Sequence, residues 1–368
     1  MTVLDPDQLA SIELPTADEE IWRYSRIGDL DLSAYRLTAH APEVSGPTEY
    51  VEIAGDTVDL FPDETPDVFA RINRDAASQV RIVVPANQVV DGTITIMHTV
   101  PADGALICPR LVIEAGDNSE VTVIERFVSA GDGAALVLPV LQLTAGQAAR
   151  VNYLALNELS HDAWSLGNQQ AVGGRDSSTL LASVALGGDY ARVRTEARLS
   201  GQGGSTRQVA LYFAGGNQMH DFRTIQDHDA PHTHSDLLFK GAVQDHSASV
   251  YTGLIKIREH AGGTTAYQTN RNLTLSDGAW AESVPNLEIL TNDVKCSHAS
   301  TVGPIDEDQR FYLESRGVRP EIAERLVVLG FFDEVLSQLP AQELAADLRA
   351  RVAAKLNIGA TNDEEDAA

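Results

Sequence analysis

The sequence predicts a mainly β protein with small helical regions at both ends. Between about Val80 and Val302, short alternating or β-branched runs recur, among them VRIVV, TITIMHTV, VTVIERFV and YTGLIKI. Gly, Asn and Asp separate these runs at short intervals, and helical spacing is absent over roughly two hundred residues. Many short strands without helices between them are typical of a sandwich, a barrel or a parallel β-helix. We assign this β core to residues 80–303.

The turns between the runs carry further information about the core. Segments such as EAGDNSE, LTAGQAA, LSGQGGS and REHAGGT resemble the corners of successive coils. No fixed period emerges from their spacing. The pattern alone therefore favours a coiled β-helix only slightly over a stacked sandwich.

Residues 1–79 are predicted to form an N-terminal helical or irregular region. Within residues 15–35, Thr16 or Asp18 can cap a short helix. The apolar residues expected on the buried side of that helix are Ile21, Trp22 and Ile27.

From Ile305 the apolar period becomes helical, which predicts a C-terminal helical domain over 304–357. Asp306 or Asp308 can cap its first helix, and Gly317 stands where a left-handed terminating residue belongs. Pro320 occupies the first turn of the next helix, and a third apolar stripe follows at Leu344, Leu348, Val352 and Leu356.

Helices of this kind beside a β body form either a docking module or a packed cap, and the sequence leaves both open. The acidic segment 358–368 has no large apolar residue and is predicted to be disordered.

Composition restricts the class of partner and the compartment. The 368 residues include 27 basic and 53 acidic side chains, and the net charge of −26 would repel nucleic acid and anionic membranes. No apolar run is long enough to span a bilayer, and the first 14 residues lack the features of a secretory signal. Two cysteines, Cys108 and Cys296, are too few for a disulfide scaffold, so we expect a cytoplasmic protein.

Common catalytic motifs are missing from the sequence. There is no G-x-x-x-x-G-K-[ST], H-E-x-x-H, C-x-x-C or G-x-S-x-G. An ATPase, a zinc protease of this type or an α/β-hydrolase is therefore poorly supported.

Histidines are concentrated in one stretch of the chain. Five of the ten lie between residues 219 and 246, namely His220, His228, His232, His234 and His246. The His232-Thr-His234 spacing would place two imidazoles on one face of a strand and resembles the cupin H-x-H motif. The glutamate expected a few residues later is missing. A metal-dependent, cupin-like oxygenase that uses His232, His234 and His246 is the alternative function, but a structural or surface role for most of these histidines is the simpler interpretation.

A second cluster is Cys296-Ser-His298. In a strand, alternation would place the thiol and the imidazole on the same face. One soft and one borderline ligand suit iron–sulfur or zinc chemistry, but two ligands cannot hold a cluster alone. Other residues or another subunit would have to contribute, and a buried structural cysteine remains an equal alternative.

The region around this motif resembles a known family. The run TAYQTNRNLTLSDGAWAESVPNLEILTNDVKCSHASTVG at residues 265–303 is similar to the SufB/SufD family of iron–sulfur cluster assembly proteins. The flanking HTHSDLLFKGAVQDHSASVYTGLIKI and IDEDQRFYLESRGV agree, and EEIWRYSRIGDLDL resembles the family's opening segment. DVKCSH and AYQTNRNL are more like SufD than SufB. Ala299 departs from the pattern, where glycine is expected.

The resemblance implies a fold and a function. It implies a right-handed parallel β-helix flanked by helical regions, in a non-catalytic scaffold subunit that holds no tightly bound cofactor of its own. SufD-like proteins pair with SufB through the β-helix and bind the SufC ATPase through C-terminal helices, here about residues 306–339. The complex builds transient iron–sulfur clusters and transfers them. The expected ligand at the SufB interface is His298, with Cys296 as its neighbour; a SufB-like role is disfavoured because only one cysteine lies in a family motif.

Overall fold

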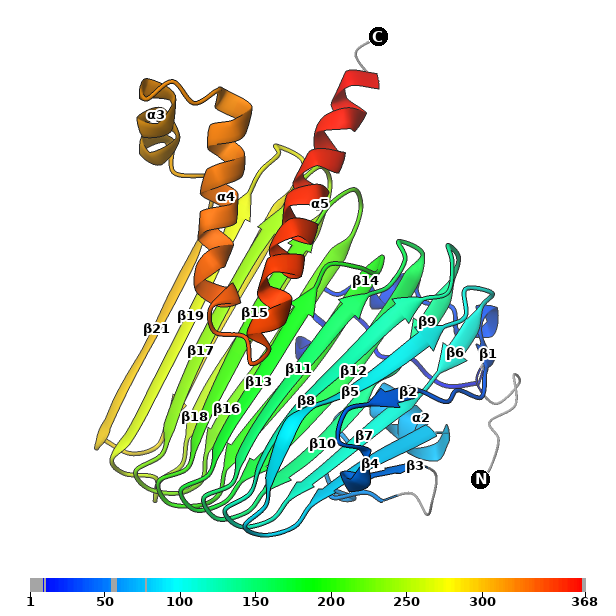
Figure 1. Ribbon diagram of the computed structural model, residues 1–368, viewed down its shortest axis with the longest axis vertical. Coiled ribbons are helices and arrows are strands. Elements are labelled where there is room, and N and C mark those ends of the chain that lie inside the picture. The colour runs from blue at the N-terminus through cyan, green and yellow to red at the C-terminus, as the bar shows by residue number, and fades with distance from the viewer. Residues whose placement is uncertain (1–8, 10, 54–57, 77, 366–368) are drawn as a thin grey trace.

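The computed structural model describes residues 9, 11–53, 58–76 and 78–365, with side chains described as far as residue 356, and it is a parallel β-solenoid (Figure 1). Its first sheet contains β1 (Arg36–Leu37), β3 (Val51–Ile53), β4 (Ser78–Val84), β6 (Ala105–Ile107), β7 (Pro109–Ala115), β9 (Ala135–Val137), β10 (Val140–Ala145), β12 (Ala163–Gly173), β14 (Tyr190–Leu199), β16 (Met219–His228), β18 (Ala248–Ile257) and β20 (Trp280–Ile289). The second sheet contains β2 (Glu43–Ser45), β5 (Val89–Val100), β8 (Glu120–Ser129), β11 (Arg150–Glu158), β13 (Ser178–Ala185), β15 (Ser205–Ala214), β17 (His234–Val243), β19 (Thr264–Thr274) and β21 (Val294–Gly303).

Successive long strands alternate between the two sheets, so each coil of the chain contributes one strand to each sheet. Neighbouring coils pair in parallel, and the antiparallel pairs among the described strands are β2 with β5 and β3 with β4. The coiled alternative from the sequence is therefore confirmed over the sandwich. Coil length varies, because Trp164 pairs with Tyr190, 26 residues later, whereas Ala248 pairs with Trp280, 32 residues later. This variation explains why the sequence shows no fixed period.

One corner of each coil uses the left-handed backbone conformation. Main-chain hydrogen bonds continue from coil to coil around this corner, for example from the Asn118 amide to the Gln147 carbonyl and from the Asp176 amide to the Gln202 carbonyl. Positive φ favours Gly, Asn and Asp, which are the residues that mark the turns in the sequence. The residues that adopt it at this corner are Asn87, Asn118, Ala148, Asp176, Gly203, His232 and Gly263.

The interior of the solenoid changes character along its length. The first coils enclose an aliphatic cluster that includes Ile82, Ile113 and Leu143. The later coils enclose aromatic rings and a buried polar network, in which the Tyr212 hydroxyl donates to Asn272 Oδ1 at 2.6 Å and accepts from Asn270 Nδ2 at 2.9 Å. Both kinds of interior are buried, and the polar side chains of the second satisfy part of their hydrogen-bonding capacity with one another.

The N-terminal region covers the outer face of the first sheet. It consists of short 3-10 helices and α2 (Val68–Ala76), and Trp22 and Ile27 pack with Trp164 of β12. The predicted cap by Thr16 or Asp18 is wrong: the first short helix, Glu20–Trp22, begins after Glu19 without a side-chain cap. Ile21, predicted to be buried, is 51% exposed because the segment binds the sheet through its main chain as well as its side chains.

The C-terminal helices are α3 (Glu307–Ser315), α4 (Pro320–Leu336) and α5 (Ala345–Glu365), with a short 3-10 helix at Gln342–Leu344. The local signals in the sequence are confirmed: the Asp306 carboxylate accepts from the amides of Asp308 and Gln309, Gly317 has φ +86°, and Pro320 opens α4. Helix α5 covers most of the acidic segment 358–368, and residues 366–368 lie outside the described part. Within that part, no helix is long and apolar enough to cross a membrane.

Helices α4 and α5 lie on the outer face of the second sheet, whereas α3 stands beyond it (Figure 1). Val328, Phe332 and Val352 are fully buried against apolar side chains of β11, β13 and β15. Phe311 and Tyr312 of α3 are 70% and 57% exposed. The two alternatives for the helical domain therefore apply to different helices: α4 and α5 form a packed cap, and α3 remains uncovered.

Lys355 links α5 to the corners of the solenoid through hydrogen bonds. Its Nζ donates to the Leu186 carbonyl at 2.6 Å and to Gln218 Oε1 at 2.5 Å. Burial of the ammonium lowers the pKa of Lys355 to about 7, and the charge of Asp245 opposes this shift. The anchor is therefore sensitive to pH in the neutral range.

We expect the chain to become more stable between pH 7 and pH 8.5. In this window the unfolded chain holds a proton on Lys355 that the folded chain releases, so the free energy of unfolding rises with pH, by at most about 2 kcal/mol. Urea unfolding of the wild type and of Lys355→Met at both pH values measures this. Because other groups titrate equally in both chains, an identical pH response of the two would contradict the prediction.

Candidate functional site

The last coil leaves the solenoid open at its C-terminal end. Among the described residues, β20 pairs with β18 alone and β21 with β19 alone, so both sheets end in a free edge. Unpaired strand edges present main-chain donors and acceptors that another chain can bind. The inward-facing side chains of this coil are uncovered as well, and they form what we call the open end.

Cys296 and His298 both lie in β21 and face the inside of the solenoid. Their register partners in β19 are Ala266 and Gln268, which are buried inside the preceding coil. The predicted strand and the predicted shared face are therefore confirmed. Their role as ligands stays a prediction.

The two residues have different surroundings. Cys296 packs against a small apolar cluster with Ile255, Ile257 and Ala266, and partial burial raises the pKa of its thiol. A metal would have to displace the thiol proton. His298 is exposed, and its imidazole makes no hydrogen bond within the described part of the chain. The imidazole is the more available donor.

The rest of the open end is partly apolar. Ser283 and Ser300, from the two terminal strands, hydrogen-bond to each other through their hydroxyls at 2.7 Å. Leu287, Ile289 and Val302 are 42%, 38% and 42% exposed, although the residues beneath Leu287 and Ile289 in β18 are fully buried. This combination of free edges and uncovered apolar side chains fits a protein partner.

The histidine-rich stretch does not converge on one point. His232 lies in a left-handed corner rather than in a strand, His234 begins β17, and His246 follows the end of the same strand. Ten residues of strand separate these ends by about 30 Å. The cupin-like oxygenase site is therefore incorrect, because His232 and His246 cannot bind one metal ion.

The two remaining histidines of that stretch are internal. The His228 ring bonds to the hydroxyls of Thr233 and Ser235 at 2.7 and 2.8 Å, and burial lowers the pKa of His228 to about 4. His220 is fully buried, and burial lowers its pKa to about 3. Both are neutral at physiological pH, in agreement with the structural role favoured for most of these residues.

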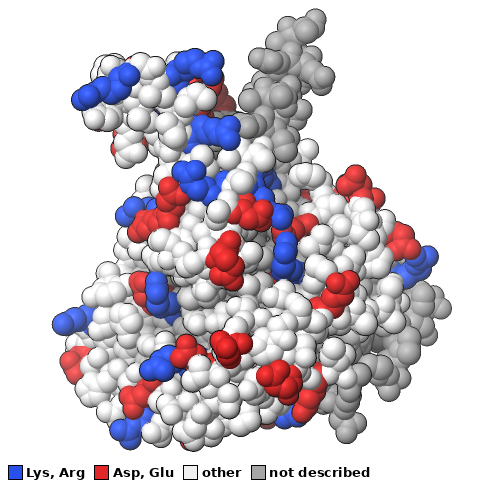
Figure 2. All heavy atoms as spheres, viewed as in Figure 1, with Lys and Arg blue, Asp and Glu red and all other residues white. Residues whose placement is uncertain are grey.

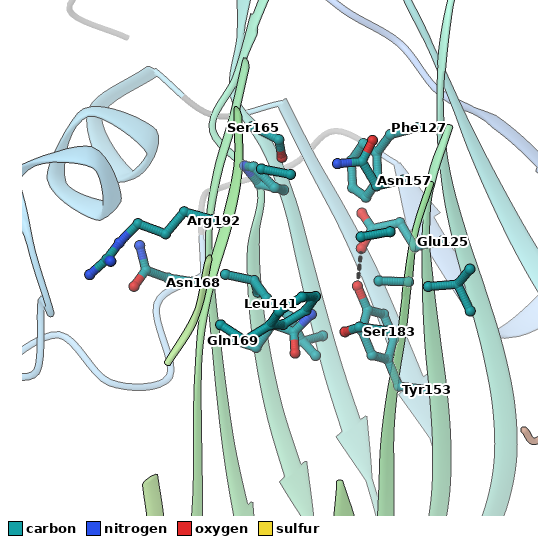
Figure 3. A pocket seen from close by; sticks show the side chains of 18 residues that line it. Glu125, Phe127, Leu141, Tyr153, Asn157, Ser165, Asn168, Gln169, Ser183 and Arg192 are labelled. Atoms are coloured by element: carbon teal, nitrogen blue, oxygen red, sulfur yellow. Dashed lines mark hydrogen bonds between the residues drawn. The ribbon is translucent and has the colours of Figure 1, made fainter. Parts of the chain in front are cut away.

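A mostly apolar cavity with a few polar side chains lies inside the middle coils and was not predicted from the sequence (Figure 3). Its volume of about 60 Å³ is bordered by Glu125, Tyr153, Asn157 and Ser183, among others. This is room for about two water molecules. The Tyr153 hydroxyl points at Glu125 and donates to Oε2 at 2.5 Å.

Two histidines connect Glu125 to the surface. His98 Nε2 lies 2.9 Å from Glu125 Oε1, and His98 Nδ1 lies 2.9 Å from Nε2 of the half-buried His40. Burial, with a smaller contribution from His98, lowers the pKa of His40 to about 4. The signal was present in the sequence: His98 and Glu125 are polar residues at apolar, inward positions of the runs TITIMHTV and VTVIERFV.

A groove of about 920 Å³ lies where α3 and α4 meet the strands β17 and β19 of the second sheet. Tyr312, Leu326 and Phe331 line one side, and Lys240 and Arg271 of the sheet line the other. Lys240 is buried beneath the groove, where its ammonium donates to the Phe331 carbonyl at 2.8 Å and pairs with Glu334. Figure 2 shows the α3 and α4 region projecting from the body with basic side chains on its surface.

Comparisons with known proteins agree with this arrangement. Residues 97–331 match the family described as "SUF system FeS cluster assembly, SufBD core domain". An iron–sulfur cluster assembly SufBD family protein of Mycobacterium bovis is 32% identical over 366 residues, which cover 95% of this chain and 91% of that protein. The iron–sulfur cluster assembly protein SufD of Escherichia coli is 32% identical over 67% of this chain and 59% of its own length. SufD of Bacillus subtilis is 30% identical over 73% of this chain and 62% of its own length. The chain thus belongs to the SufBD family of iron–sulfur cluster assembly proteins.

Proposed function

We propose that this chain is a SufD-type, non-catalytic scaffold that helps to hold a nascent iron–sulfur cluster at the open end of its solenoid. The observation that carries the proposal is the position of His298 and Cys296, side by side in the last, uncovered coil. Two donors cannot complete the coordination of a cluster. A SufB-like partner that pairs with β20 and β21 would supply the remaining ligands and cover the apolar side chains.

The cluster is cargo in this proposal. It forms at the interface between the two subunits and leaves for a recipient protein. Both cysteines are free, and Cys108 is buried, with its pKa raised to about 12 by burial. Cys108 is therefore an inert thiol. A cytoplasmic, reducing location is consistent with these free thiols.

The second partner in this proposal is a SufC-like ATPase that binds α3 and the adjoining groove. The motivation is the exposure of Phe311 and Tyr312, because aromatic residues are enriched where protein interfaces form. The buried side of α4 and α5 supports this surface from below. The docking segment is thus narrower than the predicted 306–339.

Replacing Phe311 and Tyr312 together by alanine should reduce binding of the ATPase at least about tenfold, because two interface aromatics are lost. Co-purification of the tagged variant with the co-expressed ATPase and SufB-like subunit measures this. Val89→Ala, at an apolar residue that is 61% exposed far from the C-terminal helices, is the matched control.

These point variants separate docking from folding, which a deletion of 305–368 does not. That deletion would uncover the apolar face formed by Leu211, Phe213 and Leu238. ATPase binding by the double variant at the level of Val89→Ala would contradict a docking role for α3.

A further inference from the structure

Gln268 is a buried side chain without a hydrogen-bond partner. It is 2% exposed, and neither its amide nitrogen nor its amide oxygen makes a hydrogen bond to the residues that the structure describes. A buried, unpaired amide destabilises a protein relative to an apolar side chain of similar size. Each such group in a well-packed interior therefore calls for an explanation, and a role in function is one of them.

Gln268 lies directly beneath His298. The two residues are register partners in β19 and β21 and share the inward face, so their main chains are separated by one strand spacing of about 4.8 Å. His298 belongs to the open coil, and Gln268 belongs to the closed coil below it. The amide of Gln268 is thus part of the floor of the open end.

The floor is shaped around this amide. Strand β18 has glycine at position 253, where a Cβ atom would lie 2.0 Å from Gln268 Nε2 and 2.3 Å from the Tyr251 hydroxyl oxygen. Burial raises the pKa of Tyr251 and keeps it protonated, although its hydrogen bond with Thr224 opposes that shift. The Tyr251 hydroxyl bonds to Thr224 at 2.9 Å, and its contact with Gln268 falls outside hydrogen-bond geometry.

Within the described residues, no group of the last coil forms a hydrogen bond with the Gln268 amide. The register partner of Gly253 in β20 is Pro285, which has no main-chain N–H to offer. Within the described part of the chain, the amide oxygen of Gln268 has no hydrogen-bond donor, and the register partner of Gln268 in the open coil is His298.

We propose that Gln268 is a positioning residue for His298, and this inference rests on the proposed role of His298 as a cluster ligand. An imidazole that binds metal through one nitrogen almost always donates its other N–H to a fixed acceptor, which sets the tautomer and the ring orientation. The Gln268 amide oxygen is that acceptor. It stays unpaired in the free chain and is engaged when the partner and the cluster fix His298.

The test compares Gln268→Leu with Gln268→Glu, which keeps an acceptor. Gln208→Leu is a matched control, because Gln208 lies in the same inward column two coils below Gln268, is 1% exposed and also has an unpaired amide. The full complex is assembled with each variant. Cluster formation is measured in cells through an iron–sulfur enzyme, and thermal unfolding is measured on each purified chain.

Gln268→Leu should lower cluster formation by at least about tenfold, the usual effect of losing such a partner. Gln268→Glu should retain most of it, and Gln208→Leu should behave like the wild type. Neither leucine variant should melt earlier than the wild type, because each removes an unpaired buried amide. Ring ¹⁵N chemical shifts of His298 in the complex should show a changed tautomer ratio in Gln268→Leu alone.

Normal cluster formation in Gln268→Leu, while His298→Ala abolishes it, would overturn this inference and leave the proposed function intact. Normal cluster formation in His298→Ala would instead overturn the proposed role of His298. Equal losses in Gln268→Leu and Gln208→Leu, with lower melting temperatures, would show that the amides are structural and would also overturn the inference.

Discussion

Replacing Asp221 by alanine is expected to lower the free energy of unfolding by about 3–5 kcal/mol, because it breaks a buried ion-pair network. Asp221 is completely buried on the outer face of β16, beneath the N-terminal region. Its carboxylate pairs with Arg192 and with Arg223 Nε, the latter at 3.0 Å, and accepts from the Tyr190 hydroxyl at 3.1 Å. Burial disfavours the charge of Arg192, and the adjacent Asp221 outweighs this effect, so the pKa of Arg192 is raised.

The same network fastens the N-terminal region to the sheet. Arg192 donates to the Ile21 carbonyl at 2.5 Å and stacks on Trp22 with its guanidinium carbon 4.0 Å from the ring centre. Arg223 donates to the Arg23 carbonyl. Without Asp221, two buried guanidinium groups lose their counter-ion. Hydrogen exchange should therefore increase first in the segment around residues 16–35.

Urea unfolding and hydrogen exchange of Asp221→Ala measure the two effects. Asp103→Ala is the control, because it removes a surface pair in which Arg36 and Asp103 are 66% and 68% exposed. Such pairs contribute about 0–1 kcal/mol. If Asp221→Ala and Asp103→Ala unfold at the same urea concentration, the network does not anchor the N-terminal region.

Local chemistry in the sequence was sufficient to predict where α3 begins and ends and where α4 begins, but not the boundaries of the N-terminal helices. Asp306, Gly317 and Pro320 act within a few residues of themselves, so their positions determine where helices begin and end. Around Trp22 the short helices depend on contacts with Arg192 and Arg223, which lie far away in sequence. No local pattern could reveal that dependence.

In the coils too, features set by neighbouring residues could be predicted from the sequence, and features set by distant residues could not. Strand texture and corner residues were visible in the sequence, whereas the pairing of coils was not, because coil length changes along the chain. The shared face of Cys296 and His298 followed from strand alternation alone. That their coil is the last one, and hence open, required the complete solenoid. Gln268 looked like any other polar residue in a strand until its unpaired amide and its register with His298 were known.

Replacing His298 by alanine should reduce cluster formation in cells by at least about 100-fold, because it removes a metal ligand rather than a residue that supports one. His298 is exposed and makes no hydrogen bond within the described part of the chain. The isolated variant should therefore keep its stability within about 0.5 kcal/mol, as expected for a surface substitution. The complex with the SufB-like and SufC-like subunits should still assemble and hydrolyse ATP.

Two neighbouring variants make this result specific. Ser297→Ala changes the adjacent side chain on the outward face of β21 and should leave cluster formation unchanged. Cys296→Ser keeps the size of the side chain but removes the soft ligand. Reduced cluster formation in this variant would show that the thiol also binds the cluster. Normal cluster formation would show that the thiol only packs in the apolar cluster with Ile255 and Ile257. If His298→Ala prevents the subunits from associating, the imidazole stabilises the interface instead of binding metal. If cluster formation is normal in His298→Ala, the imidazole neither binds the cluster nor stabilises the interface, because the loss of either role would reduce cluster formation.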